Sequence, residues 1–383
     1  MLFPSSLLVT AIIQLSLSGN SVADDATSRA VTALDALQTW YNDATGLWDS
    51  VGWWNGANCM TSIADLALLD SSVVATASYV FNNTLTKAPA SNPNPGPEVK
   101  TNYRRRRRSH GIIPRQSSGV NASQWLDSAY DDDGWWALAW IAAYDVTGDS
   151  TYLSVAEGIF SGLTAAWGTN CGDGGGIPWN PTDKYVNAIT NELFLSVAAH
   201  LANRVSSNKD YYVQWAEKEW NWFSSLGFIG ENNTINDGLL DNCQNNGATV
   251  WSYNQGVVLG GLVELNKAAP NDMYLEYANK IAVAAIETLA DFNMVIHESC
   301  EPSNCEPDAV QFKGIFIRNL QMLQSVSPSD TYTQVINSCA NSIWQNDRNA
   351  QNQLGVVWSG PYSNSDASTH SSAMDALIAA IAV

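Results

Sequence analysis

Apolar residues recur at spacings of three and four along most of the chain, which is the periodicity of helices that bury one face. Few segments alternate between apolar and polar residues, so no extended sheet is expected. In one short connection, Gly148 is predicted to end a helix and Asp149 or Ser150 to cap the next. Helices are predicted over 26–41, 61–82, 134–146, 150–167, 185–205, 210–225, 250–268, 272–291, 308–325, 330–346 and 368–382.

The predicted helices pair as hairpins, and the pairs repeat at a period of roughly 50 to 60 residues. This period is typical of a toroid of helical hairpins, in which inner helices line a core and loops at one end form a cleft. No exact sequence repeat supports the period, so the prediction depends on spacing alone. The sequence therefore predicts an all-α toroid in a single domain over 24–383.

Residues 87–120 interrupt this pattern. They contain alternating Asn and Pro residues and then a run of Arg from 104 to 108, a composition that cannot bury a core. We predict a loop or disordered insertion within the domain. A polybasic contact or a protease site is the functional alternative, and a solvated loop or misassigned coding sequence is favoured over it because the run is isolated in an acidic protein.

The first 23 residues resemble a secretory signal peptide. Residues 7–17 are mostly apolar and are followed by the small residues Ser21, Val22 and Ala23, which fit a cleavage site. An even number of cysteines is consistent with an oxidising compartment and allows three disulfides. Cys300 and Cys305 form the best local pair, and the remaining pairing stays open among Cys59, Cys171, Cys243 and Cys339. Three glycosylation acceptors begin at Asn82, Asn121 and Asn232.

The charge and the aromatic content narrow the class of partner. A formal net charge of -19 argues against nucleic acid and anionic membranes, whereas a neutral sugar polymer is compatible with it. The chain contains 16 Trp residues, whose flat faces suit stacking against sugar rings. It contains no Cys-x-x-Cys pair or Cys/His cluster for zinc and no Gly-x-Ser-x-Gly motif, so neither a zinc site nor Ser-His-Asp hydrolysis is expected.

Three consecutive acids, Asp131, Asp132 and Asp133, precede Gly134, Trp135 and Trp136. Two carboxyl groups with separated proton affinities can act as nucleophile and acid/base in sugar chemistry. Adjacent residues diverge on a regular helix, so the triplet is expected on a loop that ends at Gly134, with the helix beginning at Trp135. The alternative is that Asp133 caps the helix and the other two acids are solvated.

A second candidate segment runs from Cys171 to Asn180 and contains consecutive glycines. Gly175 and Gly176 would let the backbone approach a ligand closely, and Trp179 could stack on a sugar. The alternative is a disulfide-tethered turn with Trp179 in the core.

Polar residues also stand inside apolar helices. Asn191 with Glu192, and Tyr253 with Asn254, would point into the cleft of a toroid, or else cap helices. Lys313 and Arg318 need anionic partners if they are buried, and the acidic triplet or an acid elsewhere could supply them.

Taken in order along the chain, these segments resemble glycoside hydrolase family 76, in particular the fungal endo-1,6-α-mannanases. The resemblance covers nearly the whole mature chain, apart from 87–120. It is carried by Tyr130 to Trp140, Tyr144 to Asp149, Cys171 with Gly174 to Trp179, Asn187 to Leu193, Phe312 to Phe316 and Trp358 to Pro361.

The resemblance implies an (α/α)6 toroid that cleaves internal α-1,6-mannosidic bonds with retention of configuration. It implies that Asp131 is the nucleophile, Asp132 the acid/base and Asp133 a cap or support. Residues expected to contact substrate are Trp135, Trp136, Gly175, Gly176, Trp179, Asn191, Tyr253, Lys313 and Trp358.

The signal peptide and the cysteines predict a secreted protein. We expect a monomer that is associated with the cell wall or membrane surface, or diffuses freely, and needs no cofactor. A calcium site at the triplet is not expected, because the segment lacks the alternating ligand spacing of an EF-hand. A cell-wall transglycosylase, which joins mannan-bearing glycolipid-anchored proteins to wall glucan, and a non-catalytic mannan-binding protein remain alternatives.

Overall fold

The computed structural model describes residues 26–95, 121–303 and 305–383. The predicted signal peptide over 1–23 and the arginine run at 104–108 lie outside these residues. Of the predicted insertion, Lys87 ends a helix and Ala88–Ser91 form a 3-10 helix.

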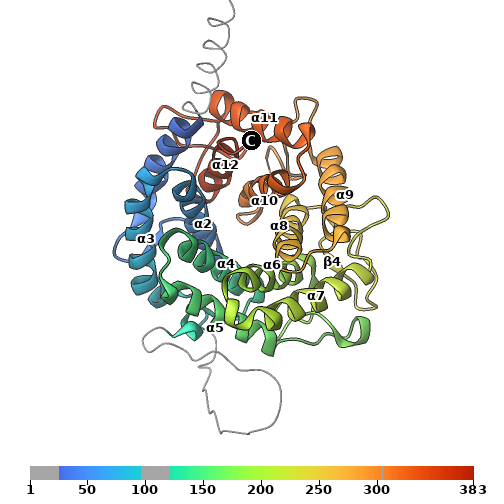
Figure 1. Cartoon of the computed structure of the whole chain (residues 1–383). Helices are drawn as coiled ribbons and strands as arrows, with labels where there is room; N and C mark the ends of the chain where they lie inside the picture. Colours follow the sequence, from blue (N-terminus) through green and yellow to red (C-terminus); the bar gives the residue numbers. More distant parts are fainter. Residues whose placement is uncertain (1–25, 96–120, 304) are drawn as a thin grey trace, which may run out of the picture.

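Six helices form a closed inner ring. Each contacts the next in chain order, and the last contacts the first (Figure 1). The inner helices are α2 (Trp53–Leu69), α4 (Tyr130–Thr147), α6 (Ala188–Arg204), α8 (Ser252–Ala268), α10 (Phe312–Val326) and α12 (Ala367–Ala379). The chain returns between them through outer helices, so all six inner helices run in the same direction.

The outer helices pack against the ring. They are a helix over 26–37 and α3 (Val74–Lys87), α5 (Ser150–Ala165), α7 (Lys209–Ser225), α9 (Asp272–Leu289) and α11 (Asp330–Asn346). Two antiparallel pairs of two-residue strands lie among the described residues: β1 (Tyr41–Asn42) with β2 (Leu47–Trp48), and β3 (Val186–Asn187) with β4 (Gly238–Leu239). The predicted all-α toroid is confirmed.

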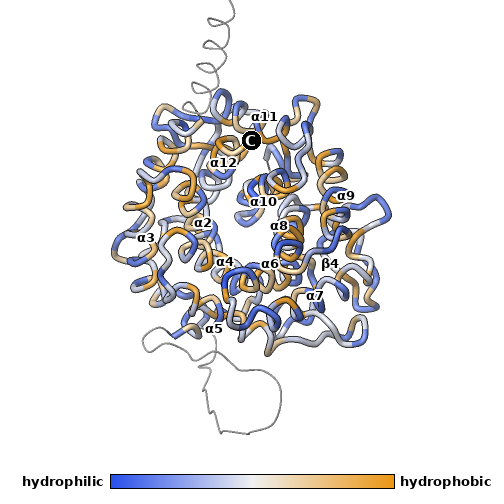
Figure 2. Tube along the Cα trace, viewed as in Figure 1, coloured by the Kyte–Doolittle hydropathy of each residue, from blue (hydrophilic) through white to orange (hydrophobic). Residues whose placement is uncertain are grey.

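Burial differs between the two rings. Nearly every residue of α6 is buried, whereas α7 buries only one face, as expected for helices covered on two sides and on one side respectively. Figure 2 shows hydrophobic residues along helices of both rings and hydrophilic residues in the loops at the periphery. No helix of the described ranges is both long and apolar enough to cross a bilayer.

The single helix predicted over 61–82 is wrong. The structure has α2 and α3 there, separated by a turn in which the Asp70 carboxylate accepts a hydrogen bond from Ser72 N at 2.9 Å. The apolar period continues through this turn, so periodicity did not reveal it. The stop at Gly148 is confirmed: its φ is 69°, and Asp149 caps α5 by accepting from Thr151 N at 2.8 Å.

Two disulfides join described cysteines. The predicted Cys300–Cys305 bridge is present, and Cys171 pairs with Cys243. Cys59 and Cys339 are free and buried, so a third bridge, which the even count allowed, does not form.

A cluster of aromatic rings fills the space between α2, α4 and α5. Trp136 lies 4.6 Å from Trp125 and 4.8 Å from Trp53, and Trp140 stacks on Tyr152 at 5.4 Å. These rings are fully or almost fully buried, so the cluster fixes α4 within the ring.

Truncating the centre of this cluster will destabilise the fold. We expect Trp140→Ala to lower the free energy of unfolding by about 3 to 5 kcal/mol, because it leaves a large cavity in close-packed surroundings. Urea denaturation measures this. Met273→Ala, at a side chain that is 54% exposed, is the control and should change stability by less than about 0.5 kcal/mol. An equal loss of stability in the two variants would contradict the conclusion that the aromatic cluster fixes α4 within the ring.

Candidate active site

The acidic triplet lies in the first turn of a helix. The helix α4 begins at Tyr130, and Asp133 N already donates to Ala129 O at 3.1 Å. The expectation that the triplet lies on a loop and the helix starts at Trp135 is therefore wrong. The physical reason is that Tyr130 N donates to the carbonyl of Trp179 at 3.0 Å, which fixes the start of the helix from a distant loop.

Asp133 is hydrogen-bonded to the segment that leads into α4. Its carboxylate accepts a hydrogen bond from Asp127 N at 2.9 Å, and the side chain is buried. Asp127 in turn accepts from Ala129 N at 2.9 Å. These bonds hold the segment that leads into α4.

Asp131 is the better stabilised anion of the remaining pair. Its Oδ2 accepts from Trp179 Nε1 and its Oδ1 from Asp132 N, both at 3.1 Å. Burial raises the pKa of Asp131 to about 7, and these hydrogen bonds oppose the rise. The positive end of the α4 dipole also favours an anion in this turn.

Asp132 is the group that retains a proton. Burial raises its pKa well above the usual range, and the adjacent charges of Asp131 and Asp127 raise it further. The pair thus combines a carboxylate that can ionise near neutrality with a neighbour that stays protonated. That separation is the requirement for one nucleophile and one acid.

Trp179 is exposed at 37% and lies beside Asp131, so the alternative that places it in the core is wrong. Its backbone N donates to Tyr185 O at 2.7 Å. The Tyr185 hydroxyl donates to Asp237 Oδ2 at 2.5 Å. A continuous chain of hydrogen bonds therefore links Asp131 to the loop after α7.

The glycines of this loop make room for a side chain of the protein. A Cβ at Gly175 or Gly176 would stand 2.2 Å from the indole of Trp222, which is buried and donates to Cys171 O at 3.1 Å. Asn191 is fully buried, and its amide donates to Ile177 O at 3.1 Å and accepts from Ile177 N at 2.9 Å. Gly175, Gly176 and Asn191 therefore shape the loop that carries Trp179, and their contact with substrate remains a prediction.

Lys313 is paired away from the triplet. It forms a short ion pair with Glu301, donates to Val356 O at 2.6 Å and lies 4.5 Å from the ring centre of Trp358. Lys313 and Trp358 are fully buried. The sequence left two possible partners for Lys313, the acidic triplet or an acid elsewhere, and the second is confirmed. The partner is Glu301, which lies in the loop before α10.

The remaining predicted aromatic residues divide between core and cleft. Trp136 is fully buried in the tryptophan cluster. Trp135 stacks on Trp54 at 5.6 Å, and Trp54 Nε1 donates to Asp308 at 2.9 Å. Tyr253 is partly exposed and stacks on Phe312 at 3.7 Å.

Tyr253 lies near several acids at one end of the inner ring. Burial raises its pKa well above 10, and the charges of Asp237, Asp131, Glu192 and Asp308 add to the rise. The sequence analysis missed Asp237 and Asp308. Both stand in connections whose composition is that of ordinary turns, so no local signal identified them. Among the described residues, no group of three His, Cys, Asp or Glu side chains is placed to hold a metal.

Comparison with known proteins identifies the family. The sequence profile described as Glycosyl hydrolase family 76 matches residues 20–382. The chain belongs to this family. It is 32% identical over 223 residues to a putative mannan endo-1,6-alpha-mannosidase of Schizosaccharomyces pombe, covering 54% of this chain and 50% of that protein. It is 32% identical over 216 residues to mannan endo-1,6-alpha-mannosidase DCW1 of Candida albicans, covering 52% and 47%. The chain thus spans about half the length of these curated relatives.

Solved family 76 structures share the fold. The α-1,6-mannanase GH76A of Salegentibacter sp. HEL1_6 superposes with a TM-score of 0.73 at 18% identity, over 93% of this chain and 98% of that chain. Dfg5 from Chaetomium thermophilum, in complex with glucosamine, superposes with a TM-score of 0.74 at 18% identity, over 94% and 90%.

The hydrogen bond from Trp179 lowers the pKa of Asp131. We expect Trp179→Phe to raise the pKa of Asp131 further, because the phenyl ring lacks the donor that favours the carboxylate. A carboxyl-carbon NMR titration measures the pKa. Trp215→Phe, on outer helix α7, is the control and should leave it unchanged. An unchanged pKa in Trp179→Phe would show that the bond does not stabilise the anion.

Glu192 should reduce stability at neutral pH. It is fully buried, neither oxygen has a hydrogen-bond partner, and burial raises its pKa well above the usual range. Above pH 4.5, folding must protonate a carboxylate that is ionised in the unfolded chain, so wild-type stability falls as pH rises.

We therefore expect Glu192→Gln to change stability little at pH 4 and to add about 1 to 3 kcal/mol at pH 7. Thermal denaturation across this pH range measures the effect. Glu287→Gln, at an exposed side chain of α9, is the control and should show no such trend. If the stability gained in Glu192→Gln did not grow with pH, this would contradict the conclusion that Glu192 is buried in its protonated form.

Proposed function

We propose that the protein is a retaining glycoside hydrolase that cleaves internal α-1,6-mannosidic bonds of mannan. The observation that carries the proposal is the adjacent pair Asp131 and Asp132, partly buried in the first turn of the inner helix α4, with their pKa values raised to different extents. An exposed indole stands beside the pair and offers a face for a sugar ring.

In the first step, ionised Asp131 attacks the anomeric carbon and forms a covalent mannosyl-enzyme. The bond to the glycosidic oxygen breaks, and protonated Asp132 transfers its proton to that oxygen. The new negative charge on Asp132 then favours deprotonation of an incoming water. The water oxygen bonds to the anomeric carbon, Asp131 leaves as a carboxylate, and Asp132 is protonated again.

Named relatives support the substrate class. One solved form of the Salegentibacter mannanase is an inactive variant, with two adjacent aspartates replaced by alanine, in complex with α-1,6-mannotetrose. The curated fungal relatives are named mannan endo-1,6-alpha-mannosidases. We further propose that the protein acts as a monomer, outside the cell or at the cell wall, without a cofactor.

Replacing the two acids separately tests their roles. We expect Asp131→Asn and Asp132→Asn each to lower kcat on α-1,6-mannan by about 10³-fold or more, measured as new reducing ends. An aryl α-1,6-mannobioside with an acidic phenol should restore the first step in Asp132→Asn, because its leaving group needs no proton, but not in Asp131→Asn. Asp173→Asn, an exposed residue of the Cys171 loop, is the control and should keep full activity.

Full hydrolysis by Asp131→Asn would contradict the proposal. Two other outcomes would redirect it. Longer products formed with an added acceptor sugar would show that a sugar hydroxyl, in place of water, intercepts the mannosyl-enzyme, as in a transglycosylase. Binding of mannan by the wild type without new reducing ends would indicate a binding protein.

A further inference from the structure

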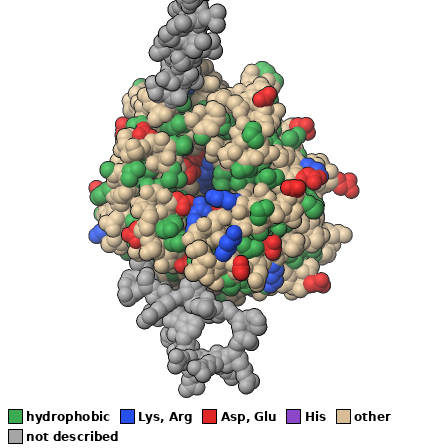
Figure 3. Space-filling view, viewed as in Figure 1, with side chains coloured by type: hydrophobic (Ala, Val, Ile, Leu, Met, Phe, Trp, Pro, Cys, Tyr) green, Lys and Arg blue, Asp and Glu red, His purple; other side chains and the backbone are tan. Residues whose placement is uncertain are grey.

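A cavity of about 270 Å³ opens at the other end of the toroid from the aspartate pair. Asp131 and Asp132 lie in the first turn of α4, whereas the cavity is lined mainly by the C-terminal halves of α2, α4, α6, α10 and α12. In the space-filling view, acidic and basic side chains meet in a hollow at the centre of the ring (Figure 3). The volume suits a ligand no larger than a few heavy atoms with water, or one small ring.

Much of the cavity wall is apolar. The lining includes aliphatic side chains from four inner helices, together with the indole of Trp135 deep in the ring. The aliphatic residues are Leu68, Leu69, Leu138, Ile141, Met322 and Ile378. A ligand with a hydrocarbon or ring stem would bury apolar surface here.

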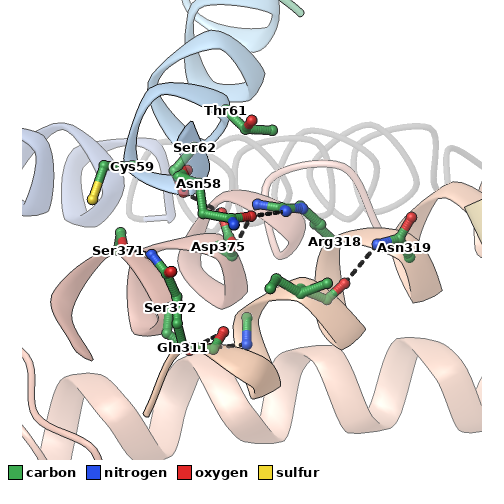
Figure 4. Close-up of polar contacts among 12 residues, drawn as sticks. Asn58, Cys59, Thr61, Ser62, Gln311, Arg318, Asn319, Ser371, Ser372 and Asp375 are labelled. Carbon is green, nitrogen blue, oxygen red and sulfur yellow. Dashed lines mark hydrogen bonds and ion pairs between the residues drawn. The ribbon is translucent and has the colours of Figure 1, made fainter. Parts of the chain in front are cut away.

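The two arginines of the wall are already neutralised. Arg204 donates to Asp145 at 2.6 Å and to Glu264 at 2.8 Å. Arg318 donates to Asp375 at 3.2 Å and makes a short hydrogen bond with Asn58 (Figure 4). Neither arginine is therefore left to attract an anion.

Asp65 is the acid of the wall that lacks a hydrogen bond or ion pair within the described chain. It is partly buried on α2, four residues after Thr61, so both side chains face the cavity on the same side of the helix. The inner helices run in parallel, so their C-terminal ends, which carry partial negative charge, converge at this end of the ring. The field in the cavity therefore favours a cation.

We propose that this cavity binds a small organic cation, a primary ammonium on a short stem, with the Asp65 carboxylate as its counter-ion and the Thr61 hydroxyl as a second acceptor. The aliphatic residues of α4 and α12 cover the stem. The site is separate from the aspartate pair and does not depend on the proposed hydrolysis.

Binding should weaken as the pH falls. Burial raises the pKa of Asp65 to about 7, Arg318 opposes the rise, and Asp375 and Asp145 add to it. Near the cavity, burial lowers the pKa of His200 and raises that of Asp375, and the charges of His200, Arg204 and Lys267 lower the pKa of Glu264 to about 2. The carboxylates of Asp145 and Asp375 are paired with arginines, so the ionisation of Asp65 controls the charge offered to a ligand.

A saturation-transfer NMR titration of the full chain with propylammonium chloride tests the proposal, with 1-propanol as the neutral probe and sodium chloride as the inorganic cation. We expect saturable binding of propylammonium alone, about tenfold weaker at pH 6 than at pH 8, because the ionised fraction of Asp65 falls by that factor. Asp65→Asn should lower the affinity at pH 8 at least tenfold. Thr61→Val should lower it several-fold.

Glu287→Gln removes the same charge from the outer surface and should bind as the wild type does. Unfolding of Asp65→Asn, checked by circular dichroism, would leave the Thr61→Val result and the pH dependence as the decisive measurements. Unchanged affinity in Asp65→Asn, equal binding of 1-propanol, full competition by sodium, or no binding of propylammonium would each overturn the proposal.

Discussion

Removing two adjacent carboxyl groups from water at the start of α4 is the constraint on which the rest of the site depends. Desolvation raises the pKa of both Asp131 and Asp132. It would make both neutral if nothing opposed it. What opposes it acts on Asp131 alone: the indole N–H of Trp179 and the backbone N–H of Asp132 both reach its carboxylate. Asp131 therefore ionises near neutrality while its neighbour keeps a proton.

The position of Trp179 depends on structure far from α4. The disulfide from Cys171 to Cys243 and the amide of Asn191 hold the loop that carries it. Gly175 and Gly176 lie against the Trp222 indole, where no larger residue would fit. The backbone of Trp179 then fixes the start of α4 through Tyr130. The glycine-rich segment thus acts on the acids by positioning one tryptophan.

The sequence predicted the toroid because the apolar period identifies the helices and the helices pair as hairpins at a period of roughly 50 to 60 residues. It could not predict where α2 ends, because the apolar period continues past Asp70 into α3. It could not predict that α4 starts at Tyr130, since the deciding bond comes from Trp179. Lys313 was recognised as a cation in need of an anion, but the choice of Glu301 depends on how a loop folds over α10. Local pattern identifies helices and acids, and contacts between distant segments decide their roles.

The anomeric form of the first product tests the account most directly. Purified protein would be incubated with unbranched α-1,6-mannan, and the new reducing ends followed by proton NMR before mutarotation. Attack by Asp131 followed by attack of water inverts the anomeric carbon twice, so the account predicts the α anomer first. The β anomer appearing first would show that no covalent intermediate forms on Asp131, and would contradict the roles assigned to the pair.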